Sequence, residues 1–169
     1  MPEEIHRIYI LDRQKNIKLP VGLRMIIRRT CHASIEVEKL AGPIEVNVII
    51  VDDTYMRSLN AQYRGIDKTT DVLSFSNLKD GKYDINPETG RQMLGDIIVS
   101  IVKMQEQALE NYNSFEQGVY QEAVRLVSHG MFHLLGYDHE RDNISRDQMR
   151  ELEGRVLNFM GFSESVVYI

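Results

Sequence analysis

Apolar and polar residues alternate from Ile44 to Ile50, where glutamate and asparagine separate isoleucine and valine side chains. This period of two predicts a half-buried β-strand, because successive side chains of a strand point to opposite faces of a sheet. Three other segments, Ile5–Leu11, Asp71–Phe75 and Gly95–Val99, predict further strands. The chain therefore carries the strands of a small sheet.

Helical signals occupy most of the remaining chain, and capping residues mark where the helices begin or end. The first helix is expected at about 20–40 with Pro20 in its first turn, and the second from Asp52 or Asp53 to Gly65. The third is expected to follow the capping residue Ser100, and the fourth a capping box of Ser114 and Gln117. The last is expected at about 143–160. Helices and strands alternate only partly, so their order predicts an α+β fold with a small mixed sheet.

The helix that follows Ser114 carries an apolar stripe. Its members are Val119, Ala123, Leu126, Val127, Gly130, Met131 and Leu134. Residues at this spacing share one face of a helix. We therefore predict that this helix belongs to the core and that Leu126, Val127, Met131 and Leu134 are buried.

The length of 169 residues suits one domain with a hydrophobic core, and we expect a single domain over residues 1–169. No stretch approaches the ~20 apolar residues that cross a membrane, so no membrane partner is expected. Cys31 is the only cysteine, which excludes an intrachain disulfide and suits a reducing cytoplasm. The net charge of −5 excludes a generally basic nucleic-acid binder, so any contact with RNA must come from a local patch.

A long polar segment from Asn77 to Met93 contains Gly81, Pro87 and Gly90 and predicts a loop. Long loops in compact domains are often functional. A surface excursion without a function is an equal alternative.

Three of the five histidines lie close together, at His129, His133 and His139. On a helix, His129 and His133 lie about 40° apart around the axis and about 6 Å apart along it, so they share one face. Gly136 accepts the left-handed conformation that ends helices, so the chain can turn back and bring His139 to the same point. Three imidazoles around one point, with a fourth position open, are typical of a catalytic zinc site. Hydrogen-bonded core histidines would explain this spacing poorly.

The same spacing occurs in metzincin proteases, where a glutamate after the first histidine acts as the general base. Here Gly130 occupies that position and offers no proton acceptor. This disfavours a peptidase and suits chemistry in which a metal makes hydroxide by itself or neutralises charge on a phosphate. Glycine would also let another backbone approach the helix, and both interpretations can hold together.

Arg64, at a predicted helix end, is a candidate phosphate ligand because a guanidinium matches phosphate geometry through two parallel hydrogen bonds. The alternative is a helix-end charge that the helix dipole favours. Asp71 and Asp138 could orient a histidine ring. For Asp71 the alternative is a hydrogen bond at the end of a strand. For Asp138 the alternative is a role in a turn, which is favoured.

Four motifs in order give the chain a resemblance to the YbeY family of bacterial endoribonucleases. They are Leu59-Asn60 with Tyr63-Arg64, Thr70–Phe75, Leu94–Ile97, and His129–His139. The resemblance covers about two thirds of the chain. Thr69 and Ser76 stand where the family often has proline, and the 77–93 segment is longer than usual. These departures concern the shape of the rim of the expected active-site cleft, and the three histidines are not among them.

The resemblance implies an α+β fold with a four-stranded sheet packed with about five helices. It implies one metal ion per chain at the end of the core helix, usually Zn²⁺, held by His129, His133 and His139; other divalent transition metals could replace it. It further implies a single-strand-specific endoribonuclease, with Arg64 as a catalytic residue. The expected roles are maturation of the 3′ end of 16S rRNA, ribosome biogenesis and ribosome quality control. The expected partners in the cytoplasm are single-stranded RNA and rRNA, the small ribosomal subunit and its proteins, and a ribosome-assembly GTPase.

Two other functions stay open. One is a ribosome-assembly factor whose metal is structural and whose nuclease activity is weak or absent, which the acidic net charge mildly favours. The other is a zinc peptidase that lacks the usual glutamate, which Gly130 disfavours.

Overall fold

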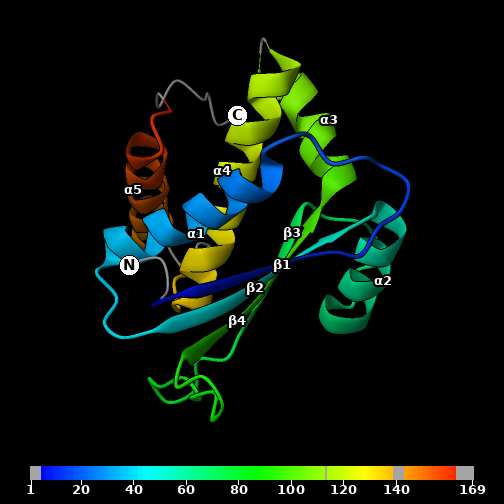
Figure 1. Ribbon diagram of the computed structural model, residues 1–169. Coiled ribbons are helices and arrows are strands. Elements are labelled where there is room, and N and C mark those ends of the chain that lie inside the picture. The colour runs from blue at the N-terminus through cyan, green and yellow to red at the C-terminus, as the bar shows by residue number, and fades with distance from the viewer. Residues whose placement is uncertain (1–4, 113, 139–142, 163–169) are drawn as a thin grey trace.

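In the computed structural model, which describes residues 5–112, 114–138 and 143–162, four strands form one mixed sheet (Figure 1). They are β1 (Arg7–Asp12), β2 (Ile44–Val51), β3 (Val72–Ser76) and β4 (Gln92–Ser100), in the order β1-β2-β4-β3. β2 pairs parallel with both β1 and β4, whereas β3 pairs antiparallel with β4. β3 is therefore an edge strand of the sheet, and α4 packs against it.

Five helices accompany the sheet in the described part of the chain: α1 (Leu23–Glu38), α2 (Asp53–Arg64), α3 (Ile101–Asn111), α4 (Phe115–Leu134) and α5 (Asn143–Phe159). Figure 1 shows α1, α4 and α5 packed together, with α2 apart from them. Ile97 and Val99 of β4 pack in the cluster that contains the apolar residues of α4, whereas Ile98 packs with Met56 of α2. Because neighbouring side chains of a strand face opposite ways, α2 covers the other face of the sheet.

α4 is the central helix, in contact with α1, α3, α5, β3 and β4. The predicted stripe is confirmed: Leu126, Val127, Met131 and Leu134 are all buried. The expected α+β fold with a small mixed four-stranded sheet is confirmed as well. No helix of the described residues is long and apolar enough to span a membrane.

Three details differ from the sequence prediction. α1 begins at Leu23, not at Pro20, because Gly22 takes the left-handed conformation at φ 85° and starts the helix there. Ser114 precedes α4, but among the described residues its side chain makes no capping hydrogen bond, so the predicted capping box is wrong. β4 begins at Gln92, inside the predicted loop, because Gln92 pairs with Ile44 of β2 across the fold.

Candidate metal centre

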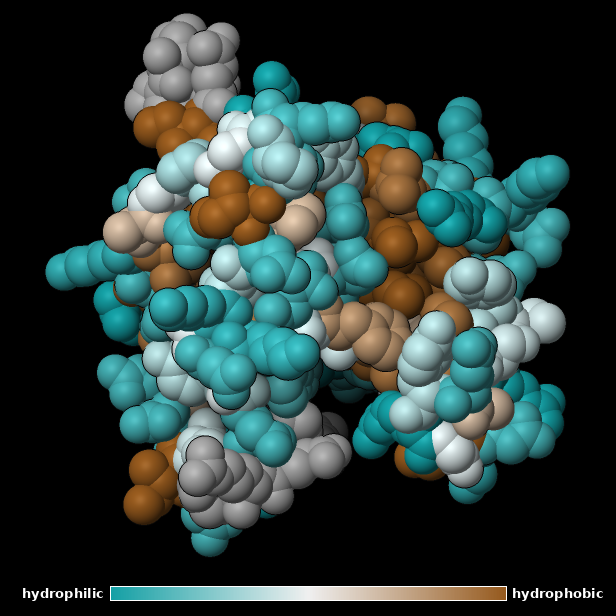
Figure 2. Space-filling model, turned by 90° about the horizontal axis from the view of Figure 1, so that it is seen from below, coloured by the Kyte–Doolittle hydropathy of each residue, from teal (hydrophilic) through white to brown (hydrophobic). Residues whose placement is uncertain are grey.

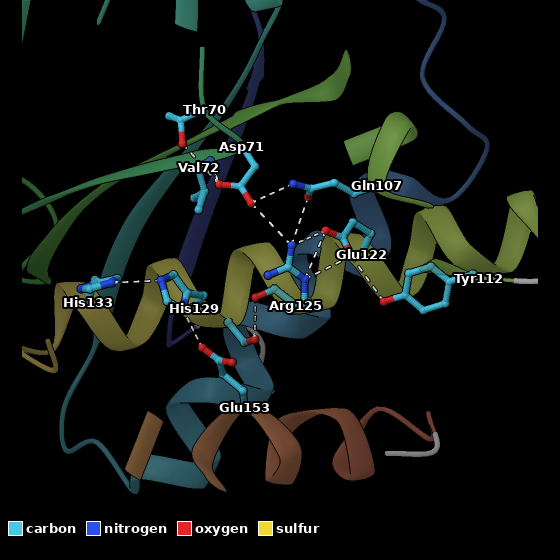
Figure 3. A network of polar contacts seen from close by, with 11 residues as sticks. Thr70, Asp71, Val72, Gln107, Tyr112, Glu122, Arg125, His129, His133 and Glu153 are labelled. Carbon is cyan, nitrogen blue, oxygen red and sulfur yellow. Dashed lines mark hydrogen bonds and ion pairs between the residues drawn. The ribbon is translucent and has the colours of Figure 1, made fainter. Parts of the chain in front are cut away.

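α4 brings two of the predicted metal ligands together. His129 and His133 lie one turn apart on the helix, and their Nε2 atoms are 3.0 Å from each other (Figure 3). Two nitrogen ligands of one tetrahedral zinc ion, each at 2.0–2.1 Å, would lie about 3.3 Å apart. The two imidazoles therefore already have nearly the separation that a shared ion requires, and the donor set fits zinc.

A buried carboxylate of α5 holds the first of these rings. Glu153, only 5 % exposed, lies 2.7 Å from His129 Nδ1 through its Oε1. A proton on Nδ1 leaves the lone pair of Nε2 directed at His133, which is the arrangement that a metal ligand needs. Sequence analysis missed Glu153, although a charged residue between the apolar residues Leu152 and Val156 of α5 is a visible signal.

His139 lies outside the described residues, as do its neighbours 140–142. Within the described ranges, no group of three or more His, Cys, Asp or Glu side chains is arranged to hold a metal ion. The described part of the chain thus supplies two converging histidines. Gly136, at φ 97°, ends α4 as predicted, and its N–H donates to His133 O. Binding of one ion by all three histidines stays a prediction.

The end of α4 is fixed from two sides. Ser76 Oγ and Tyr83 Oη both donate hydrogen bonds to Leu134 O, at 2.7 and 2.6 Å. Leu134 directly follows His133, so β3 and the long 77–93 segment both anchor the turn that carries this ligand. At least one residue of the predicted loop therefore has a structural role beside the candidate centre.

A cleft of about 370 Å³ opens over the two histidines. It is lined by Arg64, Thr70, Asp71, Val72, Leu73, Ser74, His129, His133 and Asp138. Arg64 reaches it from the end of α2, which Gly65 terminates in the left-handed conformation. The structure therefore places the predicted phosphate ligand, one aspartate after α4 and the histidine pair around one cavity.

Gly130 has a packing reason. A Cβ atom built on it would lie 2.7 Å from Ile97 Cγ2 and 3.2 Å from Ser74 Oγ. The sheet thus approaches α4 so closely that no larger side chain fits without movement. A glutamate at this position, as in the metzincin pattern, would therefore require Ile97 or the sheet to move.

A polar network occupies the next part of α4 and includes Asp71 (Figure 3). Arg125 is hydrogen-bonded to the fully buried Glu122, to Gln107 Oε1 at 3.1 Å and to Asp71 Oδ2 at 3.5 Å. Burial opposes the charge of Arg125, but the hydrogen bonds and negative charge of Glu122, followed by Asp71, outweigh it and raise the pKa of Arg125. The hydrogen bonds that Asp71 makes here join it to Arg125, to Gln107 Nε2 at 3.3 Å and to Val72 N at 2.8 Å, which agrees with the alternative of a strand-end hydrogen bond. The carboxylate that contacts His129 is that of Glu153.

Comparison with known proteins finds similar sequences over most of the chain. The family model described as endoribonuclease YbeY matches residues 9–161. A protein named endoribonuclease YbeY from Desulforamulus reducens is 39 % identical over 156 residues, covering 92 % of this chain and 98 % of the relative. Its namesake from Clostridioides difficile is 39 % identical over 147 residues, covering 87 % of this chain and 92 % of the relative.

A solved structure is similar as well. The solution structure of TM1509 from Thermotoga maritima matches with a TM-score of 0.55 and 28 % sequence identity, covering 92 % of each chain. Family model and relatives extend over nearly the whole length, including the histidine helix and the Arg64 segment. This chain belongs to the endoribonuclease YbeY family.

Proposed function

We propose that this protein is a metal-dependent endoribonuclease that cuts single-stranded RNA in the cleft between α4 and β3. The observation that carries the proposal is the convergence of His129 Nε2 and His133 Nε2, 3.0 Å apart, in the cleft that Arg64 also lines. Membership of a family of endoribonucleases supports the same activity.

His129, His133 and His139 would hold the ion, with Zn²⁺ as the expected metal. When bound, such an ion supplies a Lewis acid and an activated water at neutral pH. Glu153 keeps the ring of His129 oriented by accepting the proton of Nδ1. Arg64 would bind the non-bridging oxygens of the phosphate and stabilise the charge that collects there in the transition state.

We further propose, from the family resemblance, that the RNA is ribosomal. The roles would be maturation of the 3′ end of 16S rRNA, ribosome biogenesis and quality control in the cytoplasm. The small ribosomal subunit, its proteins and a ribosome-assembly GTPase would be the partners. The net charge of −5 supports a requirement for such partners, because the chain has no overall positive field that attracts RNA.

The test is RNA cleavage by purified protein whose metal is removed with a chelator and then restored. We expect cleavage of a single-stranded oligonucleotide to disappear and return, and the His133→Ala variant to stay inactive after metal is added. An assembly factor with a structural metal would lose stability on chelation yet cleave no RNA in any state. Cleavage of casein would indicate the peptidase alternative, which is disfavoured because Gly130 offers no general base.

A further inference from the structure

Tyr63 and Phe75 form an aromatic pair at the edge of the sheet. Their ring centroids lie 5.0 Å apart with an interplanar angle of 65°. Phe75 is half-buried and packs against the apolar cluster beneath α2, whereas Tyr63 remains 58 % exposed. Contact with Phe75 holds the exposed ring of Tyr63 at the surface, where it can contact a ligand.

The pair adjoins the candidate active cleft on both of its elements. Tyr63 directly precedes Arg64 on α2, and Phe75 directly follows Ser74 on β3; Arg64 and Ser74 both line the cleft. Consecutive Cα atoms are about 3.8 Å apart, so the backbone of each ring-bearing residue lies beside that of a residue lining the cleft, while the rings themselves lie outside that lining. Because side chains alternate along β3, Phe75 faces the side of the sheet that α2 covers. A bound chain would thus pass over the edge strand from the cleft to the rings.

Polar groups lie beside the rings. Asp96 is the direct partner of Phe75 in the sheet, so both side chains share one face. Asp96 is half-buried and accepts a hydrogen bond from Asn47 Nδ2 at 2.9 Å. Figure 2 shows hydrophobic surface gathered on the side of the molecule that carries α2, with hydrophilic residues around it. A surface with stacking rings and a neighbouring hydrogen-bond acceptor matches a nucleobase, which has apolar faces and polar edges.

We propose that Tyr63 and Phe75 form a stacking platform for one base of the RNA strand that is cut, next to the phosphate bound by Arg64. The inference rests on the proposed function, because RNA must be the substrate. Aromatic side chains stack on bases without regard to sequence and only when the base is unpaired. The platform would therefore give the enzyme its preference for single strands.

The first experiment measures the affinity of the full-length, metal-loaded protein for a labelled single-stranded RNA oligonucleotide, by fluorescence anisotropy read before cleavage proceeds. Stacking on one base is worth a factor of about 5 to 150 in affinity. We expect Tyr63→Ala to weaken binding by such a factor and Tyr63→Phe to bind like the wild type. Tyr55→Ala is the matched control, since Tyr55 is another exposed tyrosine of α2, at 47 % exposure, and lies about 12 Å along the helix from Tyr63.

A second experiment removes the base instead of the ring. Oligonucleotides with one abasic position, moved along the strand, should bind the wild type more weakly at one position. The Tyr63→Ala protein should not respond to that same change, because the two changes remove the same contact. Melting temperatures of all variants check that each is folded.

Equal affinity of Tyr63→Ala and wild type, or equal losses in Tyr63→Ala and Tyr55→Ala, would overturn the platform. If Tyr63→Ala binds RNA normally but loses self-association in sedimentation, the platform is also overturned, because the rings then belong to a protein interface. Failure of the nuclease proposal looks different, because RNA would bind in a Tyr63-dependent way without being cut. A wild type that binds no RNA would refute both.

Discussion

Removal of the Glu153 carboxylate tests whether this residue prepares His129 for a metal ion. Its Oε1 lies 2.7 Å from His129 Nδ1, a distance typical of a charge-assisted hydrogen bond, and the side chain is nearly buried. Partners of this kind change metal affinity by about 10- to 100-fold, which corresponds to about 1.4–2.7 kcal/mol. Glu153→Ala should therefore weaken zinc binding within this range. Glu153→Gln should lose less, because its amide oxygen can still accept the Nδ1 proton.

The assay is competition for zinc between the protein and a chromophoric chelator. Glu151→Gln is the matched control, since Glu151 is an exposed glutamate of the same helix. The metal-free Glu153→Ala protein should also lose about 1–3 kcal/mol of stability, because Nδ1 is left without an acceptor in a largely buried place. A folded Glu153→Ala protein with the zinc affinity of the wild type would refute the reasoning.

Three further predictions follow from the same helix and its cleft. Leu126→Ala should lower the free energy of unfolding by ~2–5 kcal/mol in urea denaturation, because Leu126 is buried in the main cluster; an unchanged midpoint would contradict this. Gly130→Ala should destabilise by about 1–3 kcal/mol, because its Cβ would lie 2.7 Å from Ile97 Cγ2, whereas a gain in stability would show that helix propensity outweighs the contact. Arg64→Ala should slow single-turnover RNA cleavage by ~10²-fold or more with unchanged zinc content, and Arg64→Lys should recover only part of the rate; wild-type cleavage by Arg64→Ala would remove Arg64 from the catalytic site.

Local features of the fold could be predicted from the sequence because each depends on neighbouring residues. Asp52 and Ser100 cap α2 and α3 through their side chains, as expected from their positions before helical segments. The apolar stripe of α4 is buried because helical spacing places its members on one face. Gly136 ends α4 because glycine accepts a positive φ without strain. The spacing of His129 and His133 likewise determined that both rings share one side of the helix.

The tertiary structure decided what depends on residues far apart in the chain. Glu153 meets His129 only because α5 packs on α4, and Asp71 meets Arg125 only because β3 runs along α4. The early start of β4 follows from its pairing with β2, and the same sheet brings Ile97 against Gly130. Such contacts arise from the packing of surfaces whose partners no local pattern specifies. The sequence by itself determined the helices, the strands and the histidine pair, whereas the packing of α5, β3 and β4 against α4 determined which side chains surround that pair.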